Sequence, residues 1–436
     1  MAKKENIFLK STFILIISGF LTKTFGFIIR IIYTRIIGEK GISLYALATP
    51  TYSLLLTIST LAIPTSISKL IAENIAAKKR SLSILTTSAT IILTTNFILI
   101  FIMLIFSKFI AYNLLKEPLT YPILIAMALT LPFVSISSVF KGYFYGKQNM
   151  IPHATSNIIE QIIRLLIITY TLPKLMQINT ITAVIGLVLL TIISEISSII
   201  VFLFFLPKKI NLNTRDLKPT KHNTRNILDI SLPTVSSRII GNVGYFFEPI
   251  ILTNLLLFSG YSNSYILTEY GAYNAYAITL LTMPSFFINA ISMALLPEIS
   301  KFHLNRNSNM INKRIKQGLI FSFILGTFFS LLIYFYRDQL LFTLYNTSNG
   351  SNYIKYLAPF FVLFYLEGVL ISSLQALNKA KTTMKISFYG VIIKLITLSI
   401  LSLCHIGLYS LLISEIINII FVVLTNYIIL QKTLKN

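Results

Sequence analysis

The stretch from Ser83 to Phe106, SILTTSATIILTTNFILIFIMLIF, contains no charged side chain in 24 consecutive residues. A helix rises about 1.5 Å per residue and the hydrocarbon core of a bilayer is about 30 Å thick, so about 20 apolar residues can cross it. The stretch is therefore predicted to be a transmembrane helix. It decides the fold class because much of the remaining sequence has the same character.

The composition agrees with this reading. Of 436 residues, 55% are hydrophobic and 12% are charged, and the mean hydropathy is +0.77. One water-soluble core could not bury so much apolar surface, which excludes a soluble enzyme. We predict an all-α membrane protein with twelve transmembrane helices. The expected spans are 8–30, 42–63, 83–106, 120–142, 152–174, 181–206, 228–250, 272–296, 317–336, 354–377, 384–404 and 408–430.

The charge balance predicts the orientation. The chain has 37 Lys and Arg against 14 Asp and Glu, which in a soluble protein would suggest nucleic-acid binding. With the amino terminus in the cytoplasm, the expected inner segments carry 25 of these cations and the outer segments seven. Because cytoplasmic loops are enriched in Lys and Arg, both termini are predicted to be cytoplasmic, in the cell membrane, with no nucleic-acid partner.

The first apolar run follows three lysines, as in a signal peptide, but it continues past Lys23, so an uncleaved first span is expected. Cys404 is the single cysteine, which excludes an intramolecular disulfide framework, and the four histidines show no metal-ligand spacing. No cofactor and no metal site are predicted.

The longest polar connection, residues 207–226, divides the expected spans into six and six. We therefore predict an N-terminal lobe of residues 1–206, a cytoplasmic linker of 207–226 and a C-terminal lobe of 227–436. Four short matches recur in the same order in both halves: Lys23–Gly26 with Arg238–Gly241, Ile63–Lys69 with Leu296–Lys301, Ile162–Leu165 with Ile392–Leu395, and Ser194–Ile196 with Ser414–Ile416. Since each half has an even number of spans, the repeat is predicted to be parallel, with its axis along the membrane normal and a central cavity between the lobes.

One pair of glycines predicts a close helix contact. Gly142 and Gly146 stand four residues apart near the end of the fourth expected span, so they lie on one face of a helix. Small residues at this spacing let two membrane helices approach closely.

We single out nine charged residues that stand well inside the expected spans or near their outer ends. An ionised side chain at the bilayer centre costs about 2.5–3.5 kcal/mol even on the lenient insertion scale, so each needs a partner, a wet cavity or a function. Six of them have candidate partners within their own half. In the first half these are Glu160, Arg164 and Glu195, and in the second Glu367, Lys394 and Glu415. Structural charge pairs are one interpretation of these six, and proton or cation coupling is the other.

The remaining three are cations without an expected partner. Lys23 and Arg238 occupy equivalent places on the first helix of each half, and Arg30 lies seven residues after Lys23 on the same helical face. Snorkelling to the interface is the alternative, chiefly for Arg30. We predict that all three line the central cavity and bind an anionic substrate.

The sequence also resembles a known family. The segments that carry the resemblance are Gly19–Phe27, Ile63–Glu73, Gly142–Met150 and Ile159–Arg164. They resemble the stage V sporulation protein B group of polysaccharide-type flippases, within the multidrug, oligosaccharidyl-lipid and polysaccharide exporter superfamily. Lys23 stands where relatives often carry arginine, and the eighth span lacks the arginine that lipid II flippases place there.

The resemblance implies a transport function without enzymatic chemistry. The expected activity is movement of an undecaprenyl-diphosphate-linked saccharide across the cell membrane by alternating access, in peptidoglycan, spore-cortex or polysaccharide biosynthesis. Lys23, Arg30 and Arg238 are expected to bind the diphosphate. The alternatives are a cation-coupled multidrug antiporter of the same superfamily and a membrane glycosyltransferase. The expected partners are the lipid-linked saccharide and membrane lipid; a monomer is predicted, and association with cell-wall synthesis proteins is left open.

Overall fold

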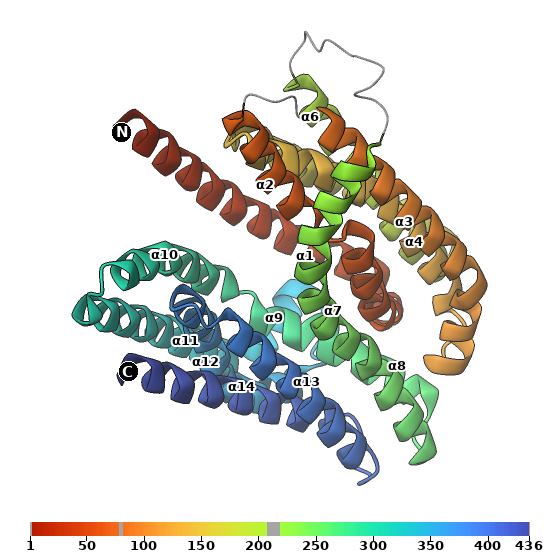
Figure 1. Cartoon of the computed structure of the whole chain (residues 1–436). Helices are drawn as coiled ribbons and strands as arrows, with labels where there is room; N and C mark the ends of the chain where they lie inside the picture. The colour runs from red at the N-terminus through yellow and green to blue at the C-terminus, as the bar shows by residue number, and fades with distance from the viewer. Residues whose placement is uncertain (1, 78–81, 207–218, 436) are drawn as a thin grey trace. The chain divides into compact units, whose positions relative to one another are not determined.

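The computed structural model describes residues 2–77, 82–206 and 219–435, and over these ranges the chain is helical, with no strand (Figure 1). The predicted all-α class is confirmed. The elements are α1 (Ala2–Thr60), α2 (Ile63–Ala76), α3 (Leu82–Phe109), η1 (Ile110–Leu114), α4 (Thr120–Gly146), α5 (Ile151–Ile178), α6 (Thr180–Phe204), α7 (Lys221–Phe258), α8 (Asn263–Gly271), η2 (Ala272–Ile278), α9 (Thr279–Thr282), α10 (Ser285–Leu304), α11 (Ser308–Tyr345), α12 (Ser351–Ala376), α13 (Ala380–Ser402) and α14 (Tyr409–Lys435).

The first two expected spans are not separated by a loop. Both lie in α1, which is interrupted at Gly38, where φ is 67° and ψ is −175°. A residue with a side chain rarely adopts this positive φ, so glycine is the residue that permits the break. Two further left-handed residues, Leu61 and Ala62, then separate α1 from α2.

Nine helices within the described ranges are long and apolar enough to cross a membrane, or ten if the bent pair formed by α8–α9 and α10 counts as one crossing. The sequence predicts twelve. Part of the difference comes from α1, which contains two expected spans and counts once, and part from α5, which is not among the nine. The chain is a multi-pass membrane protein.

The contacts divide the chain into two compact units, Met1–Phe246 and Phe247–Asn436. The same helix pairings occur within each. In the first unit α3 packs on α4, α5 on α6, α2 on α4 and α4 on α6; in the second, α11 packs on α12, α13 on α14, α10 on α12 and α12 on α14. Helices α3 to α6 contain the third to sixth expected spans, and α11 to α14 contain the ninth to twelfth. Helices at the same place in each half therefore make the same contacts, which supports the internal repeat. The direction of the repeat axis stays a prediction.

The predicted close contact at Gly142 and Gly146 is confirmed. A Cβ atom at Gly142 would lie 2.8 Å from Cα of Pro64, and one at Gly146 would lie 2.8 Å from the carbonyl oxygen of Ser68. Both contacts are with α2, so the small residues of α4 allow the two helix backbones to approach each other.

This packing gives a first prediction. Gly146→Ala is expected to lower the melting temperature of the purified protein, because the new methyl group overlaps backbone and costs about 1–3 kcal/mol. Gly241→Ala is the matched control, since a Cβ there meets nothing within 4 Å and alanine favours a helix. Equal melting temperatures for the two variants in detergent would contradict the close contact of α2 and α4.

The first half of α7 belongs to the first unit. The Asn242 side chain donates to Oγ1 of Thr57 at 2.7 Å, and Asn223 donates to Oγ of Ser83 at 2.8 Å. Ile227 is fully buried in the same core cluster as residues of α2 and α4. Of the predicted linker, residues 207–218 lie outside the described ranges, and 221–226 are part of α7.

Candidate functional site: a basic groove in the first unit

A groove of about 680 Å³ opens on the first unit. Three elements form it: α2, the end of α4 with the turn into α5, and the first half of α7. Six of its ten lining residues are polar or basic. The ten residues are Pro64, Thr65, Ser68, Lys69, Ala72, Tyr145, Gly146, Gln148, Met150 and Arg238.

The pattern of α2 explains why these side chains face the groove. Isoleucines at 63, 67 and 71 are fully buried and repeat every four residues, so they form one face of the helix. Because successive residues are about 100° apart around a helix, Lys69 stands opposite the isoleucine face and Ser68 at its edge; Lys69 is exposed and Ser68 partly exposed. The apolar face fixes α2 to the core, and the polar face is left to line the groove.

The turn after α4 shapes the groove's opposite wall. The N–H of Asn149 donates to the carbonyl of Phe144 at 3.1 Å, and the N–H of Gln148 donates to that of Tyr145 at 2.9 Å. Gln148 has a φ of 55°, so this is a Schellman ending of the helix. The hydroxyl of Tyr145 is in addition 2.9 Å from Nε2 of His153, which fixes the ring at the groove wall.

Two cations converge on this groove. Arg238 is exposed on α7 and forms no ion pair with any residue that the structure describes. Lys69 is also exposed, and its Nζ lies 4.0 Å from Oε1 of Glu73. An exposed pair at that distance is weak, about 0–1 kcal/mol, so the lysine can exchange this partner for a ligand. Guanidinium and ammonium groups beside hydroxyl and amide groups suit an anion with several oxygen acceptors, such as a phosphate.

Lys23 and Arg30 do not line this groove. Lys23 is exposed on α1 and has no ion-pair partner within the described ranges. Arg30, seven residues later on the same helix, is partly buried. Of the three cations expected to bind an anion, only Arg238 lies in the groove, and Lys69 joins it there. A shared site for Lys23, Arg30 and Arg238 stays a prediction.

The first unit holds a buried network of four charged side chains. Nη2 of Arg164 is 3.1 Å from Oε1 of Glu160 and 4.0 Å from Oε1 of Glu195, and its Nε donates to Ser194 at 3.1 Å. Lys141 approaches Oε2 of Glu160 at 3.9 Å. The two carboxylates are each 7% exposed and face two cations, so the network is balanced in charge.

The second unit holds a corresponding network. Nζ of Lys394 donates to Oε2 of Glu248 at 2.6 Å and forms an ion pair with Glu415 as well. The three residues come from α13, α7 and α14. One lysine thus holds two carboxylates together inside the bundle. Lys394 and Glu415 stand on α13 and α14, the counterparts of α5 and α6 with Arg164 and Glu195, whereas Glu248 on α7 has no counterpart in the first network.

Glu367 is not part of that network, although the sequence suggested it as a partner of Lys394. It lines a separate cavity between α10 and α12 and forms no hydrogen bond or ion pair with a described residue.

Sequence reasoning missed three charged residues. The charge count places Lys141 and Lys69 among the cytoplasmic cations. In the structure Lys141 stands in α4, which continues to Gly146, and Lys69 stands in α2, a separate helix that follows α1. Glu248 interrupts the apolar run FFEPIIL within the seventh expected span, so its membrane depth could have identified it.

Comparison with known families supports the resemblance drawn from the sequence. The family described as polysaccharide biosynthesis protein matches residues 8–303, and the MatE family matches residues 249–400. The chain is 34% identical to stage V sporulation protein B of Bacillus subtilis (strain 168) over 401 residues, which cover 90% of this chain and 77% of that one. It is 24% identical to the lipid II flippase MurJ of the same organism over 89% of this chain and 76% of that one. The predicted resemblance is confirmed.

The fold is shared with solved transporters. A multidrug resistance MATE family transporter of the MOP superfamily, in its inward-facing conformation, superposes with a TM-score of 0.77 over 95% of this chain and 94% of that one. A MOP superfamily transporter from Pyrococcus furiosus gives 0.67 over 98% and 95%. The sequence identities are 12% and 13%, so these likenesses concern the fold.

Proposed function

This chain belongs to the polysaccharide biosynthesis protein family, and from that premise we infer that it is a flippase that moves a lipid-linked saccharide from the inner to the outer leaflet of the cell membrane. The similarity to stage V sporulation protein B and to a lipid II flippase supports this substrate class. We propose a role in peptidoglycan, spore-cortex or polysaccharide biosynthesis, in keeping with relatives named for sporulation and for flipping of lipid II. We propose undecaprenyl diphosphate as the carrier.

The observation that carries the proposal is the groove with Arg238 and Lys69. A lipid-linked saccharide has a diphosphate next to a sugar, and the groove offers two cations together with hydroxyl and amide groups from Ser68, Thr65 and Gln148. Its basic end coincides with segments predicted to be cytoplasmic by their lysine content. We propose that the groove receives the head group from the inner leaflet while the polyprenyl tail stays in lipid.

The cations also provide a way to link binding to a conformational change. Arg238 and Lys69 repel each other when no anion is bound, and a diphosphate offsets that repulsion. A ligand shifts a conformational equilibrium only by its difference in affinity for the two states, so the state that brings both cations closest to the diphosphate is favoured when it is bound. We propose that Lys23 and Arg30 hold the same group at a later stage, nearer the outer leaflet.

The remaining features of the proposal concern architecture. We propose twelve crossings, with α1 counted on both sides of Gly38 and α5 included, in two parallel six-helix lobes of residues 1–206 and 227–436 joined by residues 207–226. Both termini are cytoplasmic in this topology, and the protein acts as a monomer, with or without cell-wall synthesis proteins. We propose that the protein transports its substrate without catalysing a chemical reaction, in keeping with relatives named for flipping and transport.

A flipping assay tests the function. The purified chain is reconstituted into vesicles that contain a fluorescent undecaprenyl-diphosphate saccharide in the inner leaflet, and a membrane-impermeant glycosidase or quencher is added outside. We expect the labelled lipid to become accessible in vesicles with protein and to stay protected in empty vesicles. Equal protection in both would contradict the flippase proposal.

The same vesicles distinguish the multidrug antiporter alternative. An antiporter would drive a cationic dye across the membrane in exchange for a cation gradient and leave the lipid-linked saccharide protected. The structural likeness to MATE transporters shows the fold, whereas the relative with 34% identity favours the saccharide substrate.

A further inference from the structure

The two walls of the basic groove differ in charge. Lys69 and Arg238 stand on the wall formed by α2 and α7, whereas the end of α4 and the turn into α5 contribute Tyr145, Gln148 and Met150. None of the lining residues of this second wall carries a charge. A ligand with one anionic end and one uncharged end therefore has a preferred direction in the groove, because complementary charges fix its orientation.

The cation of the turn after α4 does not line the groove. Lys147 directly precedes Gln148, but its Nζ lies 4.4 Å from the ring centre of Tyr143, a buried residue of the core cluster. An ammonium group is attracted by the negative face of a tyrosine ring. Lys147 is thus in contact with another side chain and is not among the residues that line the groove. The wall next to it stays uncharged.

Tyr145 is held in one orientation at this wall. Nε2 of His153 lies 3.2 Å from the amide nitrogen of Asn157 and 2.9 Å from the hydroxyl of Tyr145. An amide nitrogen can only donate, so Nε2 is the acceptor and the tyrosine hydroxyl donates to it. The rings of Tyr145 and His153 are also in contact, with centroids 4.8 Å apart. The tyrosine oxygen keeps lone pairs with which it can accept a hydrogen bond from a ligand.

The chemistry of this wall matches a sugar ring. A pyranose has an apolar face of C–H groups, which packs on an aromatic ring, and an edge of hydroxyl groups that donate and accept hydrogen bonds. Tyr145 is partly exposed and offers both a ring and a hydroxyl oxygen, Gln148 is exposed and carries an amide, and Met150 adds apolar surface. Because Tyr145 is already held by His153, little ordering of its side chain opposes binding.

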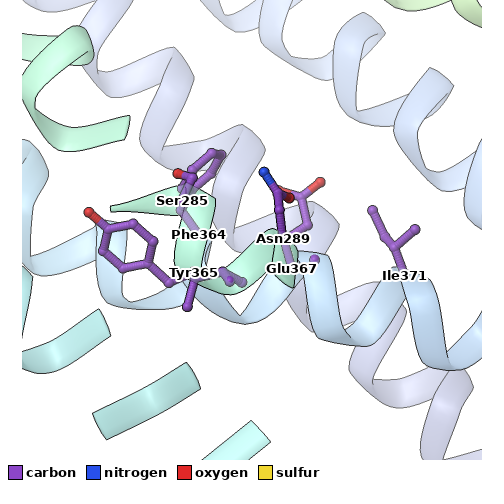
Figure 2. Close-up of a pocket in the computed structure, with 8 residues that line it drawn as sticks. Ser285, Asn289, Phe364, Tyr365, Glu367 and Ile371 are labelled. Atoms are coloured by element: carbon purple, nitrogen blue, oxygen red, sulfur yellow. The ribbon is translucent and has the colours of Figure 1, made fainter. Parts of the chain in front are cut away.

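The size of the groove suits a head group with two parts. Its volume of about 680 Å³ lies within the range of about 300–1,000 Å³ that is typical of small-molecule sites. The cavity between α10 and α12 of the second unit is a contrast, with about 200 Å³ and the carboxylate of Glu367 at its wall (Figure 2). No cation is among the described residues that line it, so it would repel a diphosphate. Of these two cavities, the groove is the one that suits a sugar joined to a diphosphate.

We propose that Tyr145, Gln148 and Met150 bind the first sugar ring of the lipid-linked saccharide, an uncharged sugar, while Lys69 and Arg238 bind its diphosphate. This inference rests on the proposed function and adds to it the direction of the head group in the groove. His153 is a positioning residue, since it contacts Tyr145 and does not line the groove. A carrier diphosphate without a sugar lacks the contacts of one wall, so the groove selects the glycosylated lipid.

Binding is measured by titration calorimetry on the purified full-length chain in detergent, with two short-chain probes of equal charge. One is farnesyl diphosphate that carries N-acetylglucosamine, and the other is the methyl ester of farnesyl diphosphate, in which a methyl group replaces the sugar. We expect the glycosylated probe to bind roughly tenfold more tightly, because it adds a ring contact and a hydrogen bond. A probe with glucuronic acid in place of N-acetylglucosamine should bind more weakly than the latter, because this wall has no cation for its carboxylate.

Variants assign the preference to the wall. Tyr145→Ala is expected to bind both probes with similar affinity, near that of the wild type for the methyl ester. Gln148→Ala should lower the preference roughly threefold, and it carries the test if Tyr145→Ala fails to fold. Arg238→Ala should weaken both probes by a similar factor and keep the preference. Tyr170→Ala is the matched control: it removes an exposed tyrosine of α5 that does not line the groove, and both affinities should stay at the wild-type values.

The positioning role of His153 has a separate test. His153→Ala is expected to weaken the glycosylated probe roughly threefold and to leave the affinity for the methyl ester unchanged, which a general loss of stability would not do. In the Tyr145→Ala background the same substitution should change the preference no further, because the two residues act as one unit. A loss of affinity for both probes alike would contradict this role.

The proposal is overturned if the wild type binds the two equally charged probes with the same affinity, or if Tyr145→Ala and Gln148→Ala keep the full preference. Tighter binding of the glucuronic acid probe than of the N-acetylglucosamine probe would also overturn it. Flipping in the vesicle assay together with equal binding of the two probes would refute this inference alone. Binding of neither probe together with no flipping would refute the proposed function, and this inference with it.

Discussion

Arg238→Ala is expected to reduce flipping of the lipid-linked saccharide by roughly 10–100-fold at subsaturating substrate, with normal protein level and membrane insertion. A hydrogen bond to a charged group contributes about 1.5–3 kcal/mol, and the arginine is proposed to hold the diphosphate in the groove. Because Arg238 is exposed and pairs with no described residue, its loss leaves no buried charge behind. The reconstituted vesicle assay measures the effect.

Arg225→Ala is the matched control on the same helix. Arg225 is exposed, its Nε lies 3.8 Å from Oδ2 of Asp229, and it does not line the groove. Lys69→Ala should resemble Arg238→Ala, and Lys23→Ala should also reduce flipping, whereas Lys23→Arg should retain much of it because the charge remains. If the Lys23→Ala, Arg238→Ala double variant flips at the normal rate, the diphosphate site lies elsewhere.

Lys394→Met is expected to have the largest effect on stability. The substitution leaves Glu248 and Glu415 side by side without their cation, and removing one partner from a buried ion pair costs about 3–5 kcal/mol. We expect most of the variant to unfold or aggregate on extraction into detergent. Size-exclusion chromatography and thermal unfolding measure the folded fraction.

Two further variants show whether the instability comes from the two unpaired carboxylates or from the loss of a lysine at any position. Lys385→Met removes an exposed lysine from the same helix, α13, and should be tolerated. The triple variant Lys394→Met, Glu248→Gln, Glu415→Gln removes all three charges together and should recover much of the lost stability, because no unpaired charge remains. Normal stability of Lys394→Met alone would mean that the two carboxylates are not held by this lysine.

Much of the fold could be predicted without coordinates. Apolar runs of about 20 residues identify membrane helices because the bilayer core has a fixed thickness, and most of each of the twelve expected spans is helical. The resemblance at Gly142–Met150 and Ile159–Arg164 identified the family, and the spacing of Gly142 and Gly146 predicted the close approach of α4 to another helix. The spacing of Glu160 and Arg164 gave their pairing, since residues four apart share a helical face.

The sequence by itself thus determined the membrane class, the helical content, the family and the contacts within single helices. Only the tertiary structure decided which of the candidate charges meet across helices: Lys394 pairs with Glu248 and Glu415 rather than with Glu367, and Arg238 lies with Lys69 at one groove. The physical reason is that hydrophobicity is a property of each residue and its immediate neighbours, whereas the partner of a charge depends on the rotation and depth of separate helices. Those are set by packing of small and large side chains over the whole unit, and no local pattern encodes them.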